Sequence, residues 1–256
     1  MTATTTGAAA ERRGWYGLLA PGLAALVVLA ILLALGTWQL RRMAWKEGLI
    51  AQIGARAKAE PVPLPPEAAW GTWSPAEGEF RRVRVRGRFH HDLETRVHGL
   101  APGDRPGAPL QGAYVLTPLA LDDGATVLVN RGFVPTELMD PARRAAGQVS
   151  GEAEVTGLMR ASEARGLFVP ESDPARGEWF VRDVPAIARA RGLARVAPFL
   201  VEADATPNPG GWPRGGQLRL DLPNNHLNYA FTWYGIALCL VGVFAVFARR
   251  RLKGLG

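Results

Sequence analysis

The chain of 256 residues carries a formal net charge of +7 and is 48% hydrophobic, so it is long enough for one domain of ordinary size plus further segments. No basic stripe interleaved with aromatic residues is present, which argues against nucleic acid as a partner despite the positive charge. The only cysteine, Cys239, excludes a disulfide framework and a Cys-x-x-Cys motif, and the four methionines are too scattered for a copper carrier.

Two long uncharged runs, residues 14–40 and 222–248, lie near the two ends of the chain. Each exceeds the roughly 20 apolar residues that cross a hydrocarbon core, so each is predicted to form a transmembrane helix. The first run could instead be a cleaved signal peptide, because Arg12 and Arg13 precede it and small residues stand near its end. Its apolar stretch is longer than the roughly 7 to 15 residues of a signal peptide, which favours a retained anchor.

Basic residues at both ends of the chain predict the orientation of the two helices. The tail Arg249-Arg250-Arg251-Leu252-Lys253 directly follows the second run, and Arg12 and Arg13 precede the first. Because basic residues in short flanking segments remain on the cytoplasmic side, both termini are expected in the cytoplasm and the central domain outside it. Membrane lipid headgroups are the expected partner of the arginine-rich tail.

The apolar runs and the composition between them divide the chain into six segments. Residues 41–60 have apolar side chains at helical spacing with charged residues between them, which predicts an amphipathic extension of the first helix. The proline-rich stretch at 61–66 is expected to end that helix. The predicted segments are a cytoplasmic tail at 1–14, a transmembrane helix at 15–40, the extension at 41–60, a mainly β domain at 61–222, a second transmembrane helix at 223–248 and a basic cytoplasmic tail at 249–256.

The central domain is predicted to consist of short strands with little helix. Asp122-Asp123-Gly124 indicates a hairpin turn, residues 184–191 followed by Gly192 indicate a short helix, and a bulge is expected at Gly87. The expected fold class is therefore a membrane protein with two transmembrane α-helices flanking a mainly β (α+β) extracytoplasmic domain, either a small barrel or a sandwich. Strands are expected at 82–89, 94–98, 114–119, 126–130, 154–160, 178–184, 199–202 and 217–222.

The motifs of common enzymes are missing from the sequence. None of the four serines lies in Gly-x-Ser-x-Gly, and there is neither a His-Glu-x-x-His motif nor a phosphate-binding Gly-Lys-Ser/Thr loop. His90 and His91 are adjacent at the end of a predicted strand and would point to opposite faces, which disfavours joint binding of one metal ion. We therefore expect a protein that is not an enzyme.

His226 stands near the start of the second apolar run, a depth at which polar residues need partners. Helical spacing places Tyr229 and Trp233 on the face of His226, so that an imidazole ligand and two aromatic walls could hold a haem. The alternative is an aromatic belt with a polar cap at the membrane interface. The residues alone leave both interpretations open.

Three blocks of the sequence together resemble the surfeit locus protein one family of cytochrome c oxidase assembly factors. The first is Leu-Gly-Thr-Trp-Gln-Leu-Arg-Arg at 35–42, the second is Val-Asn-Arg-Gly-Phe-Val-Pro at 129–135, and the third is Asn-Asn-His-Leu-Asn-Tyr-Ala at 224–230. Phe133 departs from the tryptophan expected in the family's pattern, and Asn228 departs from a common glutamine. The order and spacing of the blocks match over most of the chain.

The resemblance implies a bacterial-type factor, not an enzyme, that assists insertion or retention of haem a in the catalytic subunit of a haem-copper oxidase. On this interpretation haem a is the cofactor, the partners are the catalytic subunit and the haem a synthesis machinery, and the protein resides in the cell inner membrane with its domain in the periplasm. The alternative is a structural or accessory subunit of a respiratory membrane complex that binds no haem. A two-span receptor is disfavoured by the short C-terminal tail.

The resemblance also assigns residues to a haem site. The family's histidine at the mouth of the second span corresponds to His226, which is expected to ligate the haem iron beside Tyr229 and Trp233. Trp38, at the mouth of the first span, is expected to face the third block and to line the same site. Arg131, and one of the two arginines at 41 and 42, are candidates to pair the haem propionates, because guanidinium binds carboxylate in bidentate fashion.

Overall fold

The computed structural model describes residues 5–103, 108–218, 220 and 223–253, with only the backbone described for residues 5–16. The chain forms two compact units, one made of residues 1–52 with 221–256 and the other of residues 53–220. The first unit is helical and the second is mainly β.

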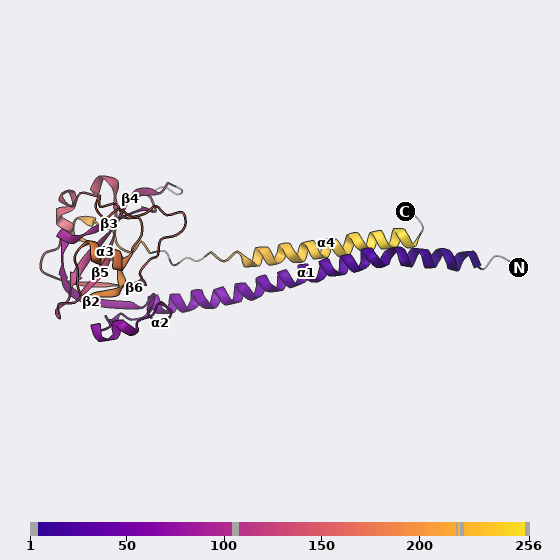
Figure 1. Cartoon of the computed structure of the whole chain (residues 1–256), viewed down its shortest axis with the longest axis horizontal. Helices are drawn as coiled ribbons and strands as arrows, with labels where there is room; N and C mark the ends of the chain where they lie inside the picture. The colour runs from indigo at the N-terminus through magenta and orange to yellow at the C-terminus, as the bar shows by residue number, and fades with distance from the viewer. Residues whose placement is uncertain (1–4, 104–107, 219, 221–222, 254–256) are drawn as a thin grey trace. The chain divides into compact units, whose positions relative to one another are not determined.

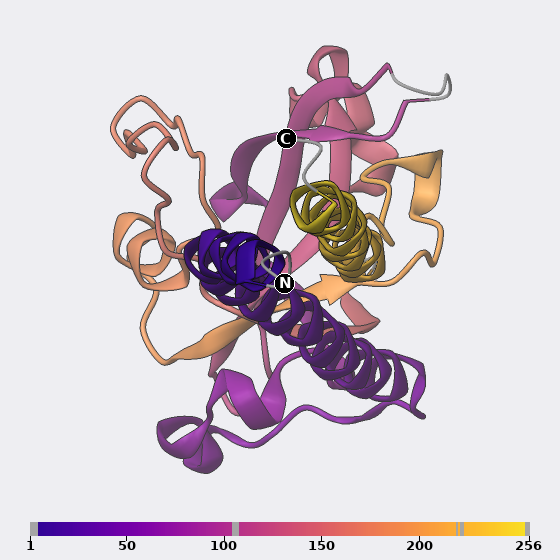
Figure 2. The same cartoon turned by 90° about the vertical axis from the view of Figure 1, so that its right-hand side faces the viewer.

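The helical unit consists of α1 (Thr5–Lys58), whose last residues belong to the second unit, and α4 (His226–Leu252). The two helices lie side by side and antiparallel (Figures 1 and 2), so that Gly17 is near Arg251 and Gly36 is near Tyr234. Small residues allow this approach, since Ala230 and Ala237 on α4 are 2% and 3% exposed. The segments Gly17–Lys58 and His226–Leu252 are long and apolar enough to cross a membrane. The chain is a membrane protein with two spans.

The β domain is a closed barrel. Its sheet has the order β1-β2-β6-β7-β5-β4-β3, and a further pairing of β2 with β4 through Arg88–Ala120 and Phe89–Leu119 closes five strands into a ring. β1 and β3 extend the sheet outside that ring. The strands are β1 (Val62–Pro63), β2 (Arg82–Phe89), β3 (Thr95–Ala101), β4 (Leu110–Ala120), β5 (Thr126–Pro135), β6 (Glu152–Ala161) and β7 (Val196–Ala203).

Short helical segments connect and cover the strands of the barrel. Asp183 accepts a hydrogen bond from the backbone N–H of Ala186 and caps α3 (Val184–Ala190), the helix that packs on the outside of the sheet. The remaining segments are η1 (Glu67–Thr72), α2 (Pro75–Gly78), η2 (His91–Leu93), η3 (Thr136–Leu138), η4 (Pro141–Gly147) and η5 (Pro209–Gly211).

Alternation along the strands separates two apolar clusters. On β5, Val127 and Val129 point into the barrel, whereas Leu128 points outward. The outer cluster contains Trp179 and Ile187, so it lies between the sheet and α3. The inner cluster includes Val83, Val85, Val127, Val129, Met159, Phe199 and Val201.

Most of the predicted strands are confirmed, but two expectations in the domain are wrong. Residues 178–184 make only isolated bridges, because Trp179 is buried in the outer cluster and Asp183 already caps α3. No bulge occurs at Gly87, which pairs with Ala153 in continuous register. Part of the expected strand at 217–222 lies outside the described residues, and Gln217, Leu218 and Leu220 are not in a strand.

The predicted hairpin turn and short helix are both confirmed. Gly124 takes a φ of 79° between β4 and β5, and the carboxylate of Asp123 accepts a hydrogen bond from the backbone N–H of Ala125. α3 ends one residue earlier than predicted, with Gly192 at a φ of 63° just beyond it.

Candidate functional site

The first and third sequence blocks meet between α1 and α4, as predicted. The hydroxyl of Thr37 lies 3.2 Å from the hydroxyl of Tyr234, and a Cβ added to Gly36 would come within 2.7 Å of the Tyr234 ring. Between two and three turns further along α1, Lys46 Nζ donates to the backbone carbonyl of Pro223. A side chain at position 36 would therefore push the helices apart where the two blocks meet.

His226 is the first residue of α4 and forms a polar contact between the two helices. Its Nδ1 lies 2.7 Å from Oε1 of Gln39, a residue that is only 9% exposed. Because an amide oxygen can only accept, Nδ1 carries the proton, and the lone pair of the neutral ring is on Nε2. Nε2 has no hydrogen-bond partner among the described residues. The ring is thus held in the tautomer that can ligate a metal through Nε2.

Two buried polar side-chain atoms of the helical unit have no hydrogen-bond partner among the described residues. The indole nitrogen of Trp233 and the side-chain oxygen of Asn224 are both buried, and neither has a hydrogen-bond partner in the described part of the chain. A buried donor or acceptor without a partner costs free energy, so such atoms mark a place where another group can bind. Trp233 is therefore suited to donate to a polar edge of a bound molecule.

The other two predicted aromatic residues lie on the surface of the helix pair. Tyr229 is 58% exposed and Trp38 is 55% exposed, whereas Trp233 is half-buried. Exposed aromatic rings at a membrane interface are also typical of an aromatic belt. Arg42 stacks on Trp45 with its guanidinium carbon 4.0 Å from the ring centroid, so this arginine already has a partner.

Arg131 belongs to the β domain, whereas the other four candidates belong to the helical unit. Its side chain is 2% exposed and shares the inward face of β5 with Val129. Nη2 donates to the backbone carbonyl of Gly147 at 2.5 Å and to Oδ1 of Asn208 at 3.2 Å. No carboxylate pairs with Arg131 among the residues that the structure describes.

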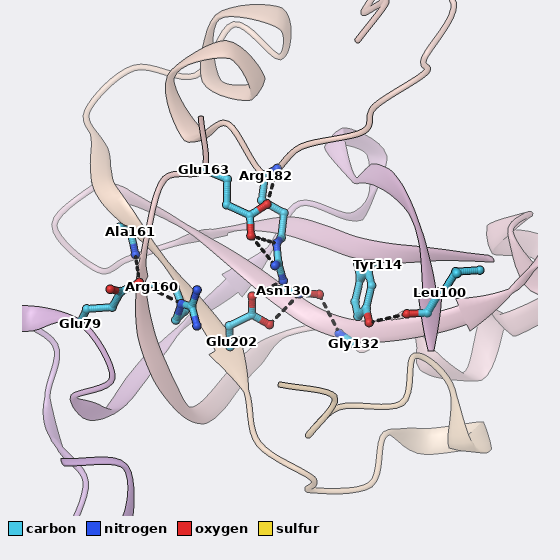
Figure 3. A network of polar contacts seen from close by, with 10 residues as sticks. All are labelled: Glu79, Leu100, Tyr114, Asn130, Gly132, Arg160, Ala161, Glu163, Arg182 and Glu202. Atoms are coloured by element: carbon cyan, nitrogen blue, oxygen red, sulfur yellow. Dashed lines mark hydrogen bonds and ion pairs between the residues drawn. The ribbon is translucent and has the colours of Figure 1, made fainter. Parts of the chain in front are cut away.

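The neighbours of Arg131 on β5 explain the rest of the second block. Asn130 points outward, where its amide nitrogen donates to Glu202 at 2.7 Å and its oxygen accepts from the backbone N–H of Gly132 at 3.1 Å (Figure 3). Gly132 has a φ of 120°, and a Cβ there would lie 2.0 Å from the carbonyl oxygen of Arg214. The asparagine and the glycine therefore shape the end of the strand and aim Arg131 inward.

A buried polar cluster on the outer face of the sheet was not predicted from the sequence. Arg182 donates to Glu202 at 2.7 Å and also pairs with Glu163, which ties the segment after β6 to β7 (Figure 3). Glu202 is 7% exposed, although it follows three apolar residues on its strand. A charged residue in an apolar run could have indicated a buried ion pair.

Burial shifts the ionisation of several groups in the β domain. Desolvation, with the nearby charge of Arg144, lowers the pKa of Arg131 to about 10. Burial raises the pKa of Glu202 even though Arg182 opposes the shift. Burial also lowers the pKa of His91, whose Nδ1 is 3.5 Å from a guanidinium nitrogen of Arg131.

Two apolar helices and a closed barrel define a two-span membrane protein with a β domain between its spans. In the described ranges no group of three His, Cys, Asp or Glu side chains could hold a metal ion. Residues 26–238 match the model of the SURF1 family. The chain belongs to this family.

Relatives in animals and a choanoflagellate are similar over most of their length. Surfeit locus protein 1 of Homo sapiens is 42% identical over 79% of this chain and 69% of the human protein. The protein of the same name from Mus musculus is 39% identical over 92% of this chain and 76% of its own length. A SURF1-like protein of Monosiga brevicollis is 39% identical over 98% of this chain and 94% of its own length.

Proposed function

We propose that this protein is an assembly factor for haem-copper cytochrome c oxidase that holds haem a for insertion or retention in the catalytic subunit. Membership of the SURF1 family supports the assignment to oxidase assembly. The observation that carries the haem part is the hydrogen bond from His226 to Gln39, which leaves Nε2 of the ring available for a metal. The same helix also carries the buried indole N–H of Trp233, which has no partner in the described part of the chain. A protein in this role binds and releases a cofactor and needs no catalytic group.

The residues of the helix pair fit a haem with one axial histidine. His226 would ligate the iron through Nε2, and Gln39 fixes the tautomer and the direction of the ring. Trp233 offers its N–H to a polar edge of the macrocycle, while Tyr229 and Trp38 offer exposed aromatic faces. When bound, the haem supplies the redox centre of the acceptor enzyme, and the factor only positions it.

The proposed location is the cell inner membrane, with both termini in the cytoplasm and the domain in the periplasm. Three consecutive arginines, Arg249 to Arg251, end α4 and support this orientation. The proposed partners are the oxidase catalytic subunit and the enzymes that make haem a. An apolar haem that passes between membrane proteins would remain at the depth of the periplasmic ends of the two helices throughout the transfer.

The test is the haem content of the purified full-length protein after co-expression with the enzymes of haem a synthesis. We expect His226→Ala to lose most of the haem and the Soret band. His90→Ala is the matched control, because His90 is exposed in the β domain and its side chain has no partner among the described residues. Unchanged haem content and an unchanged Soret spectrum in His226→Ala would remove His226 as the ligand.

A second measurement separates an assembly factor from a structural subunit of the oxidase. Deletion of the gene should leave an isolated oxidase with a deficit of haem a in its catalytic subunit. The mature oxidase should not contain this protein in stoichiometric amounts. A fully haem-loaded oxidase in the deletion strain would contradict the proposed function, and one copy per mature oxidase would favour the structural subunit.

A further inference from the structure

The barrel has an open mouth beside the end of β5. A cavity of about 420 Å³ lies there, lined by residues that continue the inward faces of the strands, among them Phe89, Val129, Val155 and Ala203. Arg131 lines the same cavity. Barrel mouths are frequent ligand sites because apolar walls there meet a few polar groups.

Arg131 contributes the uncompensated charge in this mouth. The two carboxylates that line it already have cationic partners, since Glu154 pairs with Arg86 at 2.5 Å and Asp204 pairs with Arg82 at 3.7 Å. Asp204 also accepts a hydrogen bond from the hydroxyl of Thr206. The mouth therefore has a buried positive charge and a rim whose negative charges are largely offset.

The guanidinium of Arg131 also retains donors for a ligand. Nη2 bonds to Gly147 and Asn208, Nη1 is 3.5 Å from His91, and Nε has no partner in the described part of the chain. The Phe89 ring lies 4.8 Å from the guanidinium carbon and covers one face of it. Desolvation and the charge of Arg144 lower the pKa of Arg131 to about 10 although the charge of Glu94 opposes the shift, so an anion bound directly to the guanidinium would relieve this cost.

We infer that the barrel mouth is a binding site for a small amphipathic carboxylate, whose acid group pairs with Arg131 and whose apolar part fills the cavity against Phe89, Val129 and Val155. The inference does not rest on the haem site of the helix pair, because every group that it uses belongs to the β domain. An apolar cavity with one buried guanidinium favours ligands that combine a negatively charged group with an apolar tail.

Carboxyl-labelled [1-13C]hexanoate tests the site by NMR titration of the full-length protein in lipid nanodiscs, with empty nanodiscs as the blank. Because hydrogen bonds to charged groups are the stronger kind, we expect hexanoate to bind about tenfold or more tightly than hexanol. Inorganic phosphate, which lacks the tail, should bind weakly. Equal binding of hexanol would overturn the role of the charge, and equal binding of phosphate would overturn the amphipathic class.

Two variants of the mouth and one control outside it locate the binding. Arg131→Gln should lose about tenfold or more in hexanoate affinity. Arg189→Gln should lose none, because Arg189 is exposed on α3 outside the barrel and the charge change is the same. Ala153→Phe fills the mouth while keeping Arg131, so it should also abolish hexanoate binding. This variant tests the site independently if Arg131→Gln does not fold. Undiminished binding in a folded form of either mouth variant overturns the inference.

Competition identifies the source of the carboxylate. Displacement of hexanoate by haemin, but not by haemin dimethyl ester, would assign the mouth to the haem propionates. Displacement by neither would assign it to a carboxylate other than haem, and in both cases the site stands. His226→Ala should bind hexanoate as the unaltered chain does, so failure of the haem proposal and failure of this site give different results.

Discussion

The helix pair and the barrel both carry sequence blocks typical of the family, but for different physical reasons. In the barrel, Asn130 and Gly132 are tied to Glu202 and Arg214 by buried hydrogen bonds and a close backbone approach. In the helix pair, Nε2 of His226 and the buried indole nitrogen of Trp233 have no partner among the described residues. Asn130 and Gly132 of the barrel block are therefore explained by folding, whereas the contact between Gln39 and His226 holds a ring whose Nε2 remains free to bind a ligand.

This difference has a consequence for mutations. Membrane helices associate through small residues and packing, which Gly36, Ala230 and Ala237 provide whether or not His226 is present. The end of β5 has no such redundancy, because Asn130 and Gly132 each have a fixed partner there. Substitutions should thus unfold the barrel but leave the helix pair folded and without its function.

The largest effect is expected for Gly132→Ala. The new Cβ would meet the carbonyl oxygen of Arg214 at 2.0 Å and would force alanine to a φ of 120°, so we expect a loss of about 3 kcal/mol in the free energy of unfolding. Thermal unfolding followed by tryptophan fluorescence measures this loss.

Gly151→Ala separates backbone strain from the steric clash. Gly151 has a φ of 84°, but nothing lies within 4 Å of its added Cβ, so the cost should be only about 1 kcal/mol. Equal losses at both positions would show that the strand end is not held by the approach of Arg214.

Much of the architecture of the helix pair and the barrel could be predicted from the sequence, because helices and strands leave local signals in it. Long uncharged runs marked the helices, and alternation marked β2 at its true bounds. The strand predicted at 154–160 lies within β6, whereas the one predicted at 126–130 covers only the first half of β5. Closure of the barrel could not be predicted, since it depends on the pairing of Phe89 with Leu119 across 30 residues of chain. The strand predicted at 178–184 was wrong because burial there comes without strand pairing: Trp179 is buried but makes only an isolated bridge.

The candidate site divides in the same way. His226 stood out because a polar residue beside an apolar run needs a partner, yet nothing local identifies Gln39, which is 187 residues away. Arg131 was proposed through the family pattern, and only the fold shows that it points into a barrel mouth. Glu202 and Arg182 were missed because their pairing joins two segments through tertiary contacts.

A second, smaller effect should separate function from folding in the helix pair. Gln39→Leu removes the acceptor that orients His226, so haem affinity should fall roughly 10- to 100-fold while the unfolding of the β domain is unchanged. Gln39→Glu keeps an acceptor and should retain the haem, with a shifted iron–histidine stretch in the resonance Raman spectrum. Gln52→Leu is the control, because Gln52 is exposed on the same helix.

A merely structural role for Gln39 predicts a different outcome from these variants. In that case Gln39→Leu would alter the stability of the helix pair, and Gln39→Glu would leave the iron–histidine stretch where it was. Equal haem loss in Gln39→Leu and Gln52→Leu would remove Gln39 as the residue that positions His226.

The smallest effect is a pH dependence that should be confined to the barrel. Burial lowers the pKa of His91, and the ring faces Arg131, Arg144 and Glu94. The neutral ring donates from Nε2 to the carbonyl of Val149 at 3.0 Å, which leaves Nδ1 as the acceptor toward Arg131. The unfolded chain therefore binds a proton at a higher pH than the folded one, and this part of the stability is lost as pH falls from about 6.5 through the lowered pKa.

His91→Gln should flatten that loss, because glutamine can donate and accept hydrogen bonds without titrating. Melting temperatures measured between pH 7.5 and pH 5 should fall less in His91→Gln than in the unaltered chain. His90→Gln, at an exposed neighbouring position, should leave the pH profile as it was. Parallel profiles in all three proteins would mean that His91 binds its proton equally in the folded and unfolded states, and the lowered pKa of this ring beside Arg131 would then have to be discarded.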